Sequence, residues 1–116
     1  MMEYKFHGNL TEINFKKGYT ESEADLLKKG KKARSMDEKW DIFFEDNTLN
    51  FYRSWTRRGI FQIKFIEKEN NLIVEKAFAE ERFVNDTNAA YCSELLNWLI
   101  EGSFFQRKAT FPRLKS

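Results

Sequence analysis

Residues 50–61 combine cationic and aromatic side chains in a pattern suited to binding an anion. The stretch reads Asn-Phe-Tyr-Arg-Ser-Trp-Thr-Arg-Arg-Gly-Ile-Phe. Side chains of a β-strand alternate between its two faces, so Arg53 is predicted to share one face with Phe51 and Trp55. A guanidinium binds phosphate or carboxylate through two parallel hydrogen bonds, and an aromatic ring stacks on a flat group. The stretch therefore predicts an anion site on one face of a strand.

The pair Lys39-Trp40 is predicted to join this site. If the strand before residue 45 pairs antiparallel with the next strand across a turn at 45–48, this pair falls near the segment 53–55. Hydroxyl groups just after Arg53 add further hydrogen-bond donors. The predicted ligand-binding residues are Arg53, Trp55, Lys39, Trp40, Ser54 and Thr56.

The same residues also fit a structural role, and both interpretations stay open at this point. Arg53 can lie near a sheet edge with its charged end in water, or it can pair with a carboxylate such as Asp41. Trp40 and Trp55 can be ordinary core rings. A binding site and a structural ion pair therefore compete as explanations of one pattern.

The sequence from Lys39 to Phe61 also resembles the signature of a family of small, functionally uncharacterised bacterial proteins. That family pairs a Lys-Trp strand with an Arg-Ser-Trp-Thr-Gly strand, and residues 83–100 are similar to its C-terminal segment. The signature falls on Lys39, Trp40, Arg53, Ser54, Trp55 and Thr56, whereas Arg57 and Arg58 stand before the Gly that the family has directly after Thr. The family is loosely associated with ADP-ribose-processing proteins, so the resemblance implies an ADP-ribose-like ligand and no established activity.

Residue types that support catalysis or cofactor binding are scarce. The chain has one histidine, His7, and one cysteine, Cys92. A structural zinc site needs about four ligands of these types, and a disulfide needs two cysteines. The five glycines are too dispersed for a phosphate-cradling loop. The sequence thus favours a non-catalytic protein without a metal or cofactor.

Charge is divided along the chain although the total is only +2. Residues 36–104 hold eight basic and thirteen acidic groups, whereas both flanking segments are net basic. A basic cluster at 28–34 holds five cations, but no aromatic residues are interleaved with it for stacking on bases. Nucleic acid is therefore an unlikely partner. No apolar run approaches the roughly 20 residues of a membrane span, and the chain begins without an apolar leader, so a cytoplasmic protein is expected.

Hydrophobic periodicity predicts an α+β fold in a single domain, 1–116. Short strands are expected at 4–10 and 13–16, a helix at 21–29 with a Thr20–Glu23 capping box, four antiparallel strands near 40–45, 49–56, 61–65 and 72–79, and a helix at 87–101 capped by Asp86 or Thr87 and ended by Gly102. The later helix is expected to lay Tyr91, Leu95, Trp98 and Leu99 on one face of a four- to six-stranded sheet.

Two functions from different classes remain after these exclusions. The first is a binding module whose Arg/Trp site takes an anionic ligand, such as a nucleotide or ADP-ribose-like group. The alternative is a protein-interaction module of the immunity, antitoxin or anti-defence type. It would bind a protein partner or a second copy through the acidic middle or through the basic tail 103–116, which contains Phe104, Phe105 and Phe111.

Overall fold

The computed structural model describes residues 3–35 and 38–113 and confirms an α+β fold. Its elements are, in chain order, β1 (Leu10–Ile13), β2 (Gly18–Tyr19), α1 (Glu21–Lys29), β3 (Trp40–Glu45), β4 (Thr48–Arg53), β5 (Gly59–Lys68), β6 (Asn71–Glu80), α2 (Glu81–Asp86) and α3 (Ala89–Phe104). The antiparallel meander β3–β6 and the helices at both ends of the chain agree with the sequence patterns.

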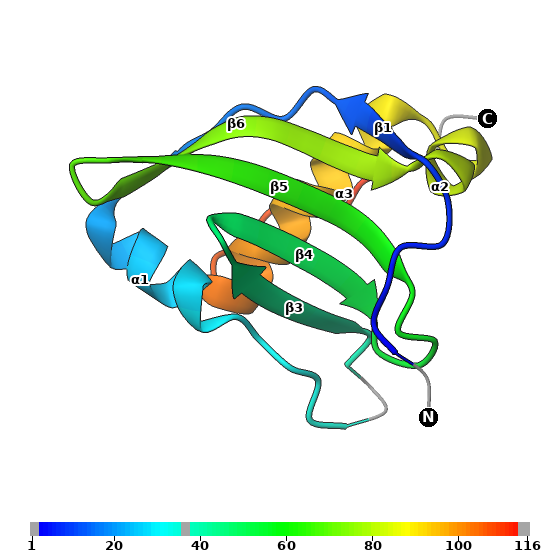
Figure 1. Cartoon of the computed structure of the whole chain (residues 1–116), viewed down its shortest axis with the longest axis horizontal. Helices are drawn as coiled ribbons and strands as arrows, with labels where there is room; N and C mark the ends of the chain where they lie inside the picture. The colour runs from blue at the N-terminus through cyan, green and yellow to red at the C-terminus, as the bar shows by residue number, and fades with distance from the viewer. Residues whose placement is uncertain (1–2, 36–37, 114–116) are drawn as a thin grey trace.

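The described strands form one six-stranded antiparallel sheet in the order β1-β6-β5-β4-β3, with β2 also paired to β6. Figure 1 shows α3 crossing behind the sheet and no helix over the face turned to the viewer. We call these two surfaces the covered face and the open face. Short loops explain the consecutive pairing of β3, β4, β5 and β6. Two residues join β3 to β4 and β5 to β6, and five residues join β4 to β5, all too short for a parallel crossover.

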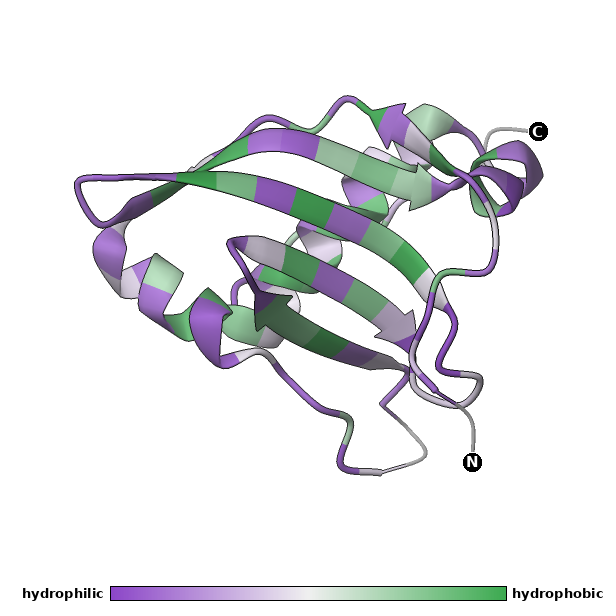
Figure 2. Ribbon diagram, in the orientation of Figure 1, coloured by the Kyte–Doolittle hydropathy of each residue, from purple (hydrophilic) through white to green (hydrophobic). Residues whose placement is uncertain are grey.

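The core lies between the covered face and α3. Alternating hydropathy is visible along the central strands (Figure 2), as expected for a sheet with one face buried. The sheet contributes Ile42, Leu49, Phe51, Phe61, Ile63, Phe65, Val74, Ala77 and Ala79, and α3 contributes Cys92, Leu95, Leu96, Leu99, Ile100 and Phe104. The buried stripe of α3 is thus wider than the four residues that the sequence singled out.

The predicted cap and stop of α1 are confirmed. Thr20 accepts from the Glu23 amide while the Glu23 carboxylate accepts from the Thr20 amide. Gly30 ends the helix with a φ of 65°, and a Cβ there would lie 2.6 Å from the Ile42 carbonyl oxygen. The close approach arises because Lys31 exchanges two backbone hydrogen bonds with Ile42 of β3. Glycine is therefore required both by conformation and by space.

Several elements near the two ends of the chain differ from the prediction. The strand β1 (Leu10–Ile13) spans the gap between the two strands expected at 4–10 and 13–16. Residues 4–9 form only an isolated bridge from Lys5 to Arg58, and residues 14–16 lie in no strand. The helix α2 was not predicted, and Thr87 ends it. Consequently α3 starts two residues later than expected, and its cap is Asn88, which accepts from the Tyr91 amide.

The segment after α3 folds back on the domain. Gly102 does not end the helix, which continues to Phe104. Phe104 is buried, and Phe105 packs on Tyr19 at 5.8 Å between ring centroids. The Arg107 guanidinium pairs with Glu23 at 2.8 Å. Of the three phenylalanines expected in a docking tail, Phe104 is therefore a core residue and Phe105 is partly buried against the core. Within the described ranges, no helix is long and apolar enough to cross a membrane.

Candidate functional site

Strand pairing places Trp40 directly opposite Arg53 on β3 and β4. The Arg53 guanidinium carbon lies 5.0 Å from the centre of the Trp40 ring, a distance typical of a cation–π contact. Trp40 also stacks on the buried Phe61 with 5.8 Å between centroids. The indole is thus held between a core ring and a cation, and the predicted convergence of the two segments is confirmed for Trp40 and Arg53.

Arg53 does not pair with Asp41, so that form of the structural interpretation is wrong. The other form, an arginine near the sheet edge with its charged end in water, is not contradicted. Asp41 is 3% exposed and lies one position along β3 from Trp40, on the open face. Its carboxylate accepts from the Tyr4 hydroxyl and from the Ala33 amide, both at 2.6 Å. Among residues 3–35 and 38–113, no carboxylate lies within ion-pair distance of Arg53. The guanidinium therefore keeps its donors available for an external anion.

A pocket of about 460 Å³ opens beside this stack, between the β3–β4 end of the sheet and α3. Its size falls in the range of small-molecule sites. The described aromatic side chains that line it are Trp40, Phe83, Tyr91, Trp98 and Phe111. Trp98 is 36% exposed and meets Phe111 edge-on at 4.9 Å between centroids. The pocket wall thus offers several ring faces and edges to a flat ligand.

The described charges on the pocket wall are mostly positive. Lys31, Lys39 and Arg53 line it together with one carboxylate, Glu38. The Glu38 carboxylate accepts a hydrogen bond from the Arg34 amide at 2.6 Å. Lys31 Nζ lies 3.4 Å from the Ser103 carbonyl oxygen, which is one weak hydrogen bond for a group with three donors. The excess of cations beside apolar walls favours an anionic occupant.

Trp55 does not share a strand face with Arg53, because β4 ends at Arg53. Residues 54–56 form a turn in which Trp55 is 64% exposed. A second hollow of about 370 Å³ is lined by Lys39, Arg53, Trp55 and Thr56. Trp55 therefore lines a hollow with the predicted cations and is not among the described residues that line the pocket under α3.

The hydroxyls predicted to help bind a ligand hold the hairpin end instead. Ser54 Oγ donates to the Glu38 carbonyl at 2.9 Å, and the Ser54 amide donates to the Lys39 carbonyl at 2.9 Å. Thr56 Oγ1 accepts from the Arg58 amide at 3.3 Å. Ser54 thus ties the Lys39 segment to the end of β4, which positions the two cations.

The sequence did not identify the α3 side of the site. Tyr91 and Trp98 were expected only as core residues of an amphipathic stripe, and Phe111 was assigned to a tail. The sequence signal for these residues was the aromatic content of the helix stripe. No local pattern indicated that part of the stripe would face a cavity. Phe83 belongs to α2, which hydrophobic periodicity did not predict because the helix is short.

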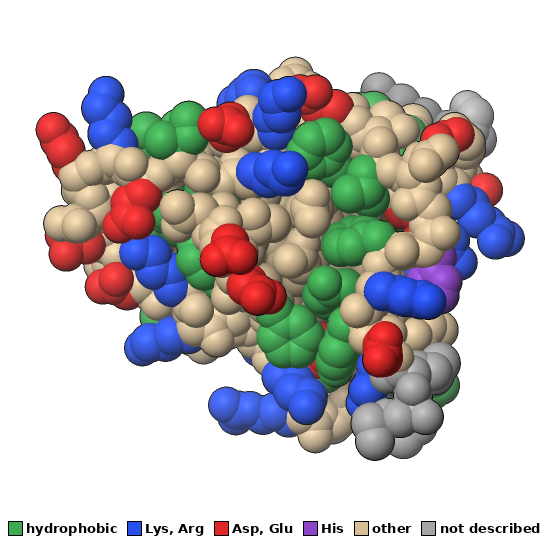
Figure 3. Space-filling model, viewed as in Figure 1, with side chains coloured by type: hydrophobic (Ala, Val, Ile, Leu, Met, Phe, Trp, Pro, Cys, Tyr) green, Lys and Arg blue, Asp and Glu red, His purple; other side chains and the backbone are tan. Residues whose placement is uncertain are grey.

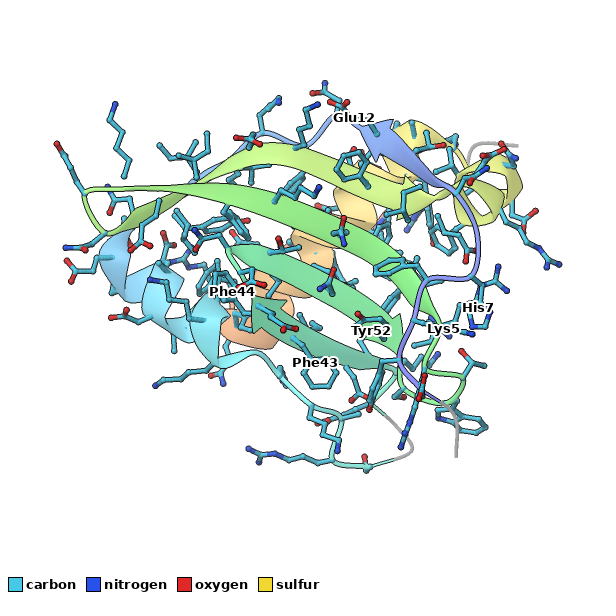
Figure 4. All side chains as sticks on the ribbon, in the orientation of Figure 1. Lys5, His7, Glu12, Phe43, Phe44 and Tyr52 are labelled. Atoms are coloured by element: carbon cyan, nitrogen blue, oxygen red, sulfur yellow. The ribbon has the colours of Figure 1, made fainter. Side chains whose placement is uncertain are left out.

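A different aromatic group lies on the open face. Tyr4, Phe6, Phe43 and Tyr52 contact one another at 5.0 to 6.0 Å between ring centroids. Hydrophobic side chains gather on this face in the space-filling view (Figure 3). Figure 4 shows Phe43 and Tyr52 near one another on neighbouring strands. Burial, together with the hydrogen bond to Asp41, raises the pKa of Tyr4. We call these four rings the open-face cluster.

Groups of the kind used in catalysis lie elsewhere. His7 is exposed on the N-terminal segment, and Cys92 is buried in α3, where burial raises the pKa of its thiol. A thiol with a raised pKa is a weak nucleophile at neutral pH. In the part of the chain that the structure describes, no group of three or more His, Cys, Asp or Glu residues is arranged to hold a metal ion.

Comparisons with family models, with curated proteins and with solved structures find no match for this chain. The resemblance to the Lys-Trp and Arg-Ser-Trp-Thr signature is therefore a prediction that no relative tests. The geometry of the site alone supports the functional proposal below.

Proposed function

We propose that this chain is a non-catalytic binding module for a small ligand that combines an anionic group with a flat ring, such as a nucleotide or an ADP-ribose-like group. The observation that carries the proposal is the pocket between β3, β4 and α3. There, Arg53 is stacked on Trp40, lacks a described carboxylate partner and faces a wall of aromatic side chains.

Arg53 is suited to binding because its orientation is fixed before a ligand arrives. The cation–π contact with Trp40 restrains the guanidinium, and the hydrogen bond from the Arg53 amide to the Arg58 carbonyl at 2.9 Å fixes the strand end. A side chain held in this way loses little conformational entropy when it forms hydrogen bonds to an anion. Lys31 and Lys39 add positive potential, and the aromatic wall binds the ring.

A thermal-shift screen of the purified protein tests the proposal. Its probes are AMP, ADP, ADP-ribose, NAD and inorganic phosphate. A ligand present at a hundred times its dissociation constant stabilises the folded state by about 2.7 kcal/mol, which raises the melting temperature of a domain of this size by several degrees. Arg53→Gln should abolish the shift. Arg82→Gln, which changes an exposed arginine of α2 outside the pocket lining, is the matched control and should retain it.

Two results would contradict the proposal. One is a flat screen with a protein whose urea unfolding shows that it is folded. The other is a ligand whose shift is the same in Arg53→Gln as in the wild type. In either case Arg53 would be a surface residue that covers the Trp40 ring.

The open-face cluster favours the alternative function, a protein-interaction module. These four half-buried rings lie on a sheet face that no helix covers (Figure 1), and partly exposed aromatic patches are typical of protein interfaces. We take a second copy of the chain as the partner to test. Light scattering over a concentration series should show a dimer that Phe43→Ser abolishes and Phe111→Ala does not. A monomer at every concentration would exclude this self-association.

A further inference from the structure

We infer that the ligand of this site carries two flat ring systems joined by a diphosphate, with one ring in the pocket under α3 and the other on Trp55. This inference rests on the proposed function and specifies its ligand class. It follows from the arrangement of two hollows around one pair of cations, which the sequence did not indicate.

The two hollows meet at Lys39 and Arg53. Both side chains line the pocket of about 460 Å³ under α3, and both also line the hollow of about 370 Å³ that contains Trp55. The two cations therefore border both an aromatic wall and an exposed indole. A ligand that reaches both hollows must pass its middle portion over these cations.

The middle portion is best matched by a group with more than one negative charge. Arg53 offers a planar set of donors that binds two oxygens at once, and Lys39 offers a compact point charge. In a diphosphate, two adjacent phosphoryl groups each present charged oxygens, so each cation can bind one of them. A single carboxylate would bind Arg53 alone and would leave Lys39, which borders the same two hollows, without an anionic partner.

Trp55 is suited to receive a second ring because its turn is held at several points. The Ser54 amide and hydroxyl bond to the carbonyls of Lys39 and Glu38, both at 2.9 Å. The Arg57 amide donates to the Arg53 carbonyl at 2.7 Å and closes the turn. An indole that is 64% exposed on such a fixed turn is preorganised for stacking.

Calorimetric titration with three probes tests the inference. AMP carries one base and one phosphate, ADP-ribose carries one base and a diphosphate, and diadenosine 5′,5′-diphosphate carries two bases and the same diphosphate. Stacking of one base on an aromatic side chain contributes enough to change affinity by about tenfold or more. We therefore expect diadenosine diphosphate to bind about tenfold more tightly than ADP-ribose, and ADP-ribose to bind more tightly than AMP.

Three variants assign each part of the ligand to a hollow. Trp55→Ala should remove the advantage of diadenosine diphosphate and leave the affinity for ADP-ribose unchanged. Trp98→Ala should weaken both ligands, because both place a base under α3. Ile73→Ala removes an exposed apolar side chain from β6, outside both hollows, and should change neither affinity. Urea unfolding of each variant checks that it is folded.

The outcomes separate this inference from the proposed function. If AMP and ADP-ribose bind in an Arg53-dependent manner but Trp55→Ala leaves the ratio of the two diphosphate affinities unchanged, the two-ring ligand is wrong and the proposed function stands. If diadenosine diphosphate binds no more tightly than ADP-ribose, the same conclusion follows. If none of the three probes binds, both the inference and the proposed function are overturned.

Discussion

The two faces of the sheet differ in how their polar side chains are paired. On the open face, the Tyr4 hydroxyl donates to Asp41, Gln62 donates to Asn50, and Lys64 lies over the Phe78 ring. On the covered face, the cation at the end of β4 stacks on an indole and has no described carboxylate. These polar groups of the open face therefore have partners within the domain, whereas the cation at the end of β4 has an aromatic ring and no described carboxylate.

Two arginines of one hairpin show this difference at close range. Arg58 donates two hydrogen bonds to Glu80 at 2.6 and 2.7 Å, and the Glu80 carboxylate is buried. Glu80 lies two positions after Phe78 on β6 and so belongs to the open face. Arg53 has Trp40 in place of such a partner. An arginine with a buried carboxylate supports the fold, and one without it is suited to binding.

The largest expected effect on stability concerns two phenylalanines, one on each face of the sheet. Phe61 touches Trp40, Phe51 and Phe83, so Phe61→Ala should lower the free energy of unfolding by about 3 to 5 kcal/mol. Phe78→Ala on the half-buried open face should cost about 1 kcal/mol. Urea denaturation measures both. Equal losses would show that the open face is as much a part of the core as the covered face.

The next effect compares the two arginines. Arg58→Met leaves the buried Glu80 carboxylate without its partner and should cost about 2 kcal/mol. Arg53→Met keeps an apolar side chain on Trp40 and removes only a cation–π contact, so the expected cost is about 0.5 kcal/mol. The free energy of unfolding in urea gives both values. A larger loss for Arg53→Met would mean that Arg53 is a structural residue.

A smaller effect compares two tyrosine hydroxyls. The Tyr4 hydroxyl donates to a buried carboxylate, so Tyr4→Phe should lower the free energy of unfolding by about 1.5 kcal/mol. The Tyr19 hydroxyl is buried beneath the covered face and has no hydrogen-bond partner among the described residues. Tyr19→Phe should therefore be within about 0.5 kcal/mol of the wild type. A large loss in Tyr19→Phe would reveal a partner for this hydroxyl.

The smallest effect is a dependence on alkaline pH. Burial raises the pKa of Tyr19 well above its usual value near 10. A group whose pKa is higher in the folded state contributes stability that is complete below the unfolded-state pKa and is lost as the pH rises above it. At pH 11, Tyr19 should account for about 1 kcal/mol of lost stability. The contribution of Tyr19 is measured by comparing the unfolding free energies of wild type and Tyr19→Phe at pH 7 and pH 11. Identical pH profiles for the two proteins would contradict the prediction.

Local patterns were sufficient where neighbours along the chain decide the structure. The Thr20–Glu23 capping box and the Gly30 stop are contacts within one helix, so residue types alone predicted them. The hairpin β3–β4 follows from alternation and a short turn, and this pairing is enough to bring Trp40 opposite Arg53. The central pair of the site was therefore predictable from the sequence.

Local patterns failed where contacts with distant parts of the chain decided the end of a strand or helix. Alternation predicted that the strand β4 continues to Thr56, but the chain turns after Arg53 as its backbone pairs with Arg58 and with the Lys39 segment. The helix α3 passes through Gly102 because Ile100 and Phe104 are buried against the core on either side of it. Burial of the helix face outweighs the weak helix propensity of one glycine.

By itself, the sequence determined the fold class, the meander and the meeting of Trp40 with Arg53, since each depends on short-range periodicity and turn chemistry. Only the tertiary structure decided what surrounds that pair. It brought Tyr91, Trp98 and Phe111 into the lining of the pocket that Lys39 and Arg53 also line, and it put Trp55 in a separate hollow beside the same two cations. These contacts join residues far apart in the chain, and their geometry depends on how α3 lies across the sheet, which no local pattern specifies.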